Sequence, residues 1–86
     1  MTSYSVEFKP SARKELDSLS DPLSMRIIEK IDTLSHTPRP SGCKQLKGYK
    51  DLWRIRIGDW RVIYIIDDKA KLISIASIAH RSEAYD

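Results

Sequence analysis

Three arginines stand within a hydrophobic stretch, "LWRIRIGDWRVIYII" (residues 52–66), that otherwise has the pattern of two strands. Its central Gly-Asp pair fits the two-residue turn of a type II′ β-hairpin. With that turn, Arg56 faces Arg61, and Arg54 falls on the same side of the sheet as both. Like charges that face each other destabilise a strand pair, and the only acid of the hairpin lies in its turn. We therefore predict that this face binds a phosphate-rich ligand.

A second set of reactive side chains follows the last predicted strand, in "HRSEAY". His80 can transfer protons near neutral pH, Arg81 can bind a phosphate with two hydrogen bonds, and Tyr85 can stack on a base. A short polar C-terminus is more often a frayed end than a site. An arginine-rich face within reach of this segment favours a site instead.

The positive charge of the chain is concentrated in one segment. The 86 residues include 15 Lys or Arg and 12 Asp or Glu, for a net charge of +3. Residues 44–61 hold six basic residues, including Lys44, Lys47 and Lys50, against two acids, whereas the rest of the chain is close to neutral. Such a patch is typical of a protein that binds a polyanion such as nucleic acid. The alternative is a solvated basic face that serves solubility alone.

The periodicity predicts a single α+β domain over residues 1–86. An alternating stretch (4–8) is followed by two helical segments, the first opened by Pro10 and the second by an Asp21 N-cap with Pro22 as its first helical residue. The predicted strands of the hairpin and a last strand, "KLISIASIA", come after an irregular connection. We expect a β-α-α-β-β-β order, with an antiparallel helical hairpin packed on one face of a four-stranded, mostly antiparallel twisted sheet.

Composition narrows the possible environments and cofactors. No apolar run approaches the roughly 20 residues that span a bilayer, and the N-terminus lacks the pattern of a secretory signal. The single cysteine, Cys43, excludes an internal disulfide and suggests a reducing compartment, so we expect a cytoplasmic protein without a membrane partner. No cluster of metal-ligand residues is evident, and we expect neither a metal nor another cofactor.

Together, "LKGYKDLWRIRIGDWRVIYIIDD" and "IASIAHRSEAY" resemble the RelE/ParE superfamily of small bacterial and archaeal toxins. The resemblance covers nearly the whole chain and implies a cognate antitoxin, which we expect to be acidic where it meets the basic segment. In the RelE branch it implies an endoribonuclease that enters the A site of the 70S ribosome, contacts ribosomal RNA, and cleaves the messenger RNA there. The reaction is an attack by the ribose 2′-hydroxyl on the adjacent phosphate, which gives a 2′,3′-cyclic phosphate and a free 5′-hydroxyl without a metal.

The resemblance also implies roles for individual residues. Arg61 matches the sheet arginine that stabilises the transition state, Arg81 the arginine beside the leaving group, and Tyr85 the tyrosine that helps to hold the substrate. His80 is then the best candidate for acid–base chemistry, although a structural histidine remains an alternative.

The sequence departs from the family pattern at Arg54 and Arg56, where some RelE members have lysines. A guanidinium is a poor base, so these two residues, with the three lysines of the basic segment, are predicted to bind RNA. A ParE-like inhibitor of DNA gyrase without RNase activity is the second reading. The tail "HRSEAY" argues against it, because ParE members generally lack this set. A degenerate member that acts only with its antitoxin on an operator is a third.

Overall fold

The computed structural model describes residues 3–46, 48 and 51–82, which form two helices and five strands. The elements in chain order are β1 (Ser5–Phe8), α1 (Pro10–Asp17), α2 (Asp21–Thr33), β2 (Lys44–Gln45), β3 (Leu52–Ile57), β4 (Trp60–Asp67) and β5 (Leu72–His80). The predicted α+β class and the helical hairpin are confirmed, whereas the predicted count of four strands is wrong. The fifth strand is β2, a two-residue segment within the connection where the sequence shows no alternating pattern.

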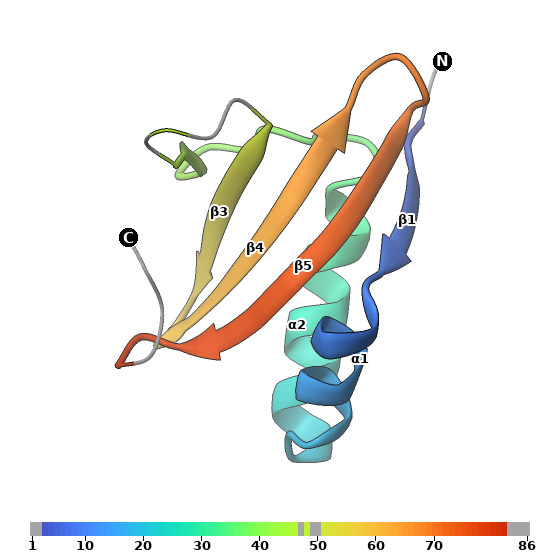
Figure 1. Ribbon diagram of the computed structural model, residues 1–86. Helices are drawn as coiled ribbons and strands as arrows, with labels where there is room; N and C mark the ends of the chain where they lie inside the picture. The colour runs from blue at the N-terminus through green and yellow to red at the C-terminus, as the bar shows by residue number, and fades with distance from the viewer. Residues whose placement is uncertain (1–2, 47, 49–50, 83–86) are drawn as a thin grey trace.

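The sheet has the order β1-β5-β4-β3-β2. Strand β1 runs parallel to β5, and the other neighbouring pairs are antiparallel, so the sheet is mostly antiparallel as predicted. Both helices lie on the same side of the sheet, with α1 against β5 and α2 against β3, and in Figure 1 the upper part of α2 passes behind β5. Helix α2 begins one residue earlier than predicted, with Ser20 as its N-cap and Asp21 as its first residue.

The hairpin of β3 and β4 has the register that the sequence predicts. Ile57 pairs with Trp60, and Arg56 pairs with Arg61, on either side of a two-residue turn. Gly58 has φ +59°, and among the described residues other than glycine only Lys71 has a positive φ. A positive φ at the first turn position alone is the signature of a type II′ turn, which glycine adopts without strain.

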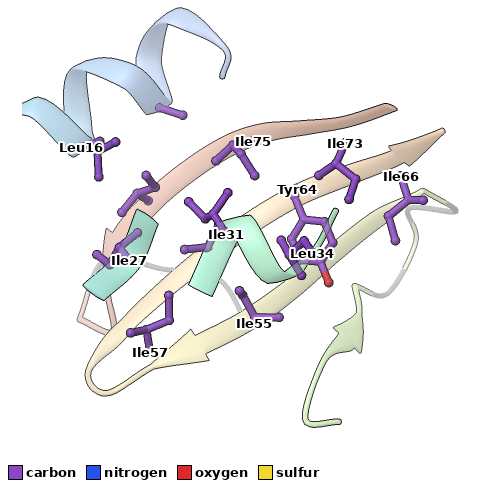
Figure 2. Packing of buried hydrophobic residues seen from close by; sticks show 13 residues of the cluster. Leu16, Ile27, Ile31, Leu34, Ile55, Ile57, Tyr64, Ile66, Ile73 and Ile75 are labelled. Carbon is purple, nitrogen blue, oxygen red and sulfur yellow. The ribbon is translucent and has the colours of Figure 1, made fainter. Parts of the chain in front are cut away.

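The core lies between the helices and one face of the sheet (Figure 2), and isoleucine dominates it. The buried side chains of the sheet alternate along β3 and β4, as expected for strands with one covered face. The helices complete the core from the other side. Its buried members are Ala12, Leu16, Ile27, Ile31, Leu34, Ile55, Ile57, Val62, Tyr64, Ile66, Ile73, Ile75 and Ile78.

Strand β5 contains an irregularity that decides where its C-terminal residues point. Ile63 pairs with Ser77, but the next residue of β4, Tyr64, pairs with Ile75, so β5 has one extra residue, Ala76. An extra residue shifts every later side chain to the opposite face of a sheet. The shift buries Ile78, which regular alternation from Ile75 would have exposed.

Candidate nucleic-acid interface

Arg56 and Arg61 face each other on the side of the sheet that the helices do not cover. They form the second pair from the β3–β4 turn, after Ile57 and Trp60. Arg56 is exposed and Arg61 is half-buried, and both also interact with other groups of the protein. The predicted juxtaposition of two guanidinium groups is therefore present, at a position that a bound phosphate could bridge.

Arg54 lies on the same face but is buried, with 4% of its surface exposed. It pairs with Lys44 on one side and with Ile63 on the other, because β2 extends the sheet beyond β3. The sequence predicts a ligand-binding face that carries all three hairpin arginines, but the burial of Arg54 leaves only Arg56 and Arg61 accessible on it; no sequence pattern indicates β2. Its Nε atom is buried without a hydrogen bond, although the residue does have other interactions.

Of the three lysines assigned to the basic segment, the structure places one. Lys44 is exposed and begins β2, beside Arg54. Lys47 and Lys50 lie outside the described residues. RNA binding by all three stays a prediction.

Arg81 lies beside the turn of the arginine hairpin. Its main-chain N–H donates a hydrogen bond of 2.7 Å to the carbonyl oxygen of Asp59, and its Nε lies 3.9 Å from the Asp59 carboxylate. Both side chains are exposed, so this ion pair contributes little to stability. The backbone contact nevertheless holds Arg81 at the end of the sheet where Arg56 and Arg61 meet.

His80 lies on the other face of the sheet from Arg61. It pairs with Trp60, whose ring it meets edge-on with centroids 5.5 Å apart and an interplanar angle of 85°. Its Nδ1 lies 3.0 Å from the Ser82 hydroxyl. The residue of β5 that faces Arg61 is Ala79. The structure thus brings Arg81, but not His80, to the arginines, and Tyr85 lies outside the described residues.

The extra residue in β5 is the physical reason for this arrangement. Without Ala76 as an insertion, His80 would share a face with Arg61. A signal was available in "ISIASIAH", because regular alternation from Ile73 would bury Ser77 and expose Ile78. A bulge that keeps Ile78 in the core resolves this conflict.

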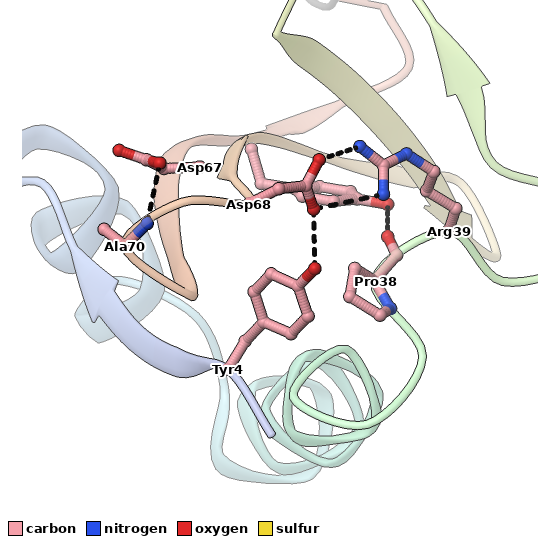
Figure 3. A network of polar contacts seen from close by, with 7 residues as sticks. Tyr4, Pro38, Arg39, Asp67, Asp68 and Ala70 are labelled. Atoms are coloured by element: carbon pink, nitrogen blue, oxygen red, sulfur yellow. Dashed lines mark hydrogen bonds and ion pairs between the residues drawn. The ribbon is translucent and has the colours of Figure 1, made fainter. Parts of the chain in front are cut away.

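A polar network fixes the connection between α2 and β2 at the opposite end of the hairpin (Figure 3). Arg39 contacts Asp68 with an Nη2–Oδ2 distance of 3.0 Å, and its guanidinium lies 5.0 Å from the centre of the Trp53 ring. The Tyr4 hydroxyl donates to the same carboxylate. The hydrogen bond from Arg39, followed by that from Tyr4, lowers the pKa of Asp68, and the same bond raises the pKa of Arg39.

Tyr64 anchors this connection from inside the core. Its hydroxyl donates a hydrogen bond of 2.8 Å to the carbonyl oxygen of Pro38, and the residue is fully buried. Burial, the largest cause, raises the pKa of Tyr64 well above the usual value of a tyrosine. This hydrogen bond and the Arg39–Asp68 pair hold the connection that precedes β2, and they therefore help to position Lys44 at the start of that strand.

Two basic residues that the sequence reasoning did not select, Arg26 and Lys30, lie on α2 near the arginine hairpin. They line a hollow of about 420 Å³ together with Arg56 and Gly58. Their spacing of four residues places them on one side of the helix, and this signal could have been read from the sequence.

No metal site and no membrane span is found in the described part of the chain. No three His, Cys, Asp or Glu side chains among residues 3–46, 48 and 51–82 come together as metal ligands would. Neither α1 nor α2 is long and apolar enough to cross a bilayer.

This protein has a helical hairpin on one face of a mostly antiparallel sheet and basic side chains on the other face. Comparison with known proteins shows that it is similar to a class of small toxins. Residues 6–85 match the family model described as the ParE toxin of the type II toxin–antitoxin system parDE. RelE1 of Methanocaldococcus jannaschii is 33% identical over 95% of this chain and 94% of its own length. The toxin RelE of Mycobacterium tuberculosis is 30% identical over 95% of this chain and 86% of its own length.

Solved structures show the same relationship. The crystal structure of the archaeal RelE–RelB complex from Pyrococcus horikoshii contains a chain that is 34% identical, with a TM-score of 0.83 over 96% of this chain and all of that chain. The isolated Escherichia coli RelE toxin, at 22% identity and a TM-score of 0.79, supports the fold alone; the match covers 90% of this chain and 83% of that chain. The chain therefore belongs to the RelE/ParE superfamily of toxins of type II toxin–antitoxin systems.

Proposed function

We propose that this chain is the toxin of a toxin–antitoxin pair and a metal-independent endoribonuclease that cleaves messenger RNA in the ribosomal A site. The observation that carries the proposal is the position of Arg56 opposite Arg61 on the open face, with Arg81 attached to the adjoining turn. The RelE names of the similar proteins favour this branch of the superfamily.

The proposed reaction is an attack by a ribose 2′-hydroxyl on the neighbouring phosphate, which forms the O2′–P bond and breaks the P–O5′ bond. The products are a 2′,3′-cyclic phosphate and a 5′-hydroxyl, and the proton lost by the 2′-oxygen is replaced on the 5′-oxygen through water. Arg61 stabilises the negative charge that develops on the phosphorane, Arg56 binds an adjacent phosphate oxygen, and Arg81 lies beside the leaving oxygen. Tyr85 is proposed to hold the substrate. Most of the rate acceleration then comes from electrostatic stabilisation and from alignment of the strand on the ribosome.

The proposal assigns no proton transfer to His80, because its ring lies on the face of the sheet away from Arg61. The role that the sequence suggested for this histidine stays a prediction. Substitution by glutamine tests it, as developed in the Discussion.

The proposed partners are an antitoxin, messenger RNA and the 70S ribosome, in the cytoplasm. Similar toxins have been crystallised as RelE–RelB complexes from Pyrococcus horikoshii and as the RelBE2 complex from Mycobacterium tuberculosis. The net charge of +4 in residues 44–61 supports an acidic antitoxin surface there and supports contacts with ribosomal RNA. We propose no cofactor.

Primer extension on messages undergoing translation tests the proposal. The wild-type toxin should produce cuts within the A-site codon, and Arg61→Ala or Arg81→Ala should reduce them by about 100-fold or more. Lys14→Ala, which removes an exposed charge from α1, is the control and should leave the cuts unchanged.

The alternative is a ParE-like inhibitor of DNA gyrase, which the description of the matching family model favours. An intact message together with accumulated gyrase–DNA cleavage complexes would support this alternative and exclude the RNase. Cuts that persist in both arginine variants would contradict the assigned roles but not the activity.

A further inference from the structure

Helix α2 and strand β3 form the two walls of a basic groove, which we define by Arg26, Lys30, Lys44, Arg54 and Arg56. It consists of two adjoining hollows of about 420 and 520 Å³, both lined by Lys30 and Arg56. Strand β2 pairs only with Trp53 and Arg54, so the turn-proximal half of β3 lies at the edge of the sheet, where the first hollow opens. The groove therefore adjoins the open face that carries Arg56 and Arg61.

The charge of the basic groove is almost entirely of one sign. Five basic side chains line it, and Glu29 is the only acid among the described lining residues. Arg26 and Lys30 form no ion pair with any residue in the part of the chain that the structure describes. Arg26 and Lys30 are thus neighbouring cations without paired carboxylates among the described residues, and such a pair attracts an anionic ligand and repels a basic one.

The spacing of the cations suits a repeating anion. Arg26 and Lys30 lie one helical turn apart, about 6 Å along the axis of α2. Arg54 and Arg56, on the opposite wall, are two residues apart in a strand, which is about 7 Å. The Nη2 atom of Arg26 lies 3.8 Å from the point that a Cβ on Gly58 would occupy, so its guanidinium reaches the turn of the arginine hairpin.

We infer that Arg26 and Lys30 bind phosphates of a single-stranded RNA, whose backbone runs from the arginine pair on the open face around the edge of β3 into the basic groove. This inference rests on the proposed function, because it extends the same substrate beyond the scissile phosphate. Arg26 and Lys30 are proposed to bind the RNA and to take no part in the cleavage step itself. An acidic segment of a protein partner would meet the same charges, and the experiment separates the two ligands.

The test measures binding of a fluorescein-labelled, 2′-O-methylated RNA oligonucleotide by anisotropy, between about 50 and 200 mM NaCl. The methylated RNA lacks the attacking hydroxyl, so binding is measured without cleavage. The Arg26→Ala/Lys30→Ala variant should bind roughly tenfold more weakly at low salt. The slope of log affinity against log salt should become shallower by about 1.4, because each lost phosphate contact on a single strand removes about 0.7.

The matched control is Lys14→Ala/Lys69→Ala, which removes the same charge from exposed positions in α1 and in the β4–β5 turn. It should keep the wild-type slope. Glu29→Gln should bind more tightly than wild type, because it removes the one acid of the groove.

Equal slopes for the groove variant and the control would overturn the inference, as would wild-type protein that fails to bind the RNA at low salt. A groove variant that keeps its RNA affinity but loses affinity for the antitoxin would overturn it in favour of a protein ligand. If wild-type toxin binds this RNA through the groove but leaves translated messages intact, the inference stands and the proposed RNase activity fails.

Discussion

His80 and Arg61 lie on opposite faces of the sheet, although they belong to neighbouring residue pairs of β4 and β5, so their substitution should have different effects. Arg61 faces the open side opposite Arg56, whereas His80 faces the helix side against Trp60. We expect His80→Gln to reduce A-site cleavage by less than tenfold, because the imidazole lies on the other face of the sheet from Arg61, which is proposed to bind the phosphate. Arg61→Ala should reduce cleavage by about 100- to 1,000-fold, the usual cost of removing a group that stabilises transition-state charge.

His80→Gln should destabilise the fold more than Arg61→Ala does, although it should affect cleavage less. His80→Gln removes the edge-on contact with Trp60, whose centroid distance of 5.5 Å and angle of 85° are favourable. Such contacts contribute about 0.5–1.5 kcal/mol, so the melting temperature should fall by several degrees in a domain of this size. Arg61→Ala relieves the repulsion from Arg56 across the strand pair but also removes the other interactions of Arg61, so it should change the melting temperature less than His80→Gln does.

The assay is a primer-extension time course on translating ribosomes, with thermal unfolding of each variant measured in parallel. A loss of cleavage of about 100-fold or more in a stably folded His80→Gln protein would refute this reasoning. Losses of that size are typical of a removed proton-transfer group, and the result would support the role that the sequence alone suggested for His80.

Two further predictions concern the network at the other end of the hairpin. Tyr64→Phe should lower the free energy of unfolding by about 1–2 kcal/mol, because the half-buried Pro38 carbonyl loses its hydrogen bond. Tyr4→Phe removes an exposed hydrogen bond and should change the free energy of unfolding by less than about 0.5 kcal/mol. Equal urea midpoints for the two variants would contradict this prediction. The pKa of Asp68 is lowered in the folded protein, chiefly by Arg39, so this contribution to stability is present at neutral pH and is lost as pH falls below about 4. The urea midpoint of wild type should therefore exceed that of Asp68→Asn at neutral pH and approach it in acid, and a difference that does not depend on pH would show that the carboxylate charge does not matter.

Local sequence patterns determined most of the fold and one half of the candidate site. The Gly-Asp turn fixed the register of β3 and β4, and this register places Ile55, Val62 and Tyr64 together in the core. The same register placed Arg56 opposite Arg61. Both helices were evident because apolar residues repeat along one face of each and proline stands near each start.

Only the tertiary structure decided how the remaining parts meet this hairpin. Strand β2 has two residues, too few for an alternating pattern, and it forms because the edge of β3 offers it hydrogen bonds. Arg54, which pairs with the first residue of β2, is buried. The extra residue in β5 moved His80 and its neighbours to the opposite face of the sheet. Burial of Ile78 stabilises the fold more than regular pairing of β5 would. Arg26 and Lys30 approach β3 only through helix packing. The sequence thus determined contacts that are close in the chain, whereas contacts between distant segments depended on which apolar side chains could be buried together.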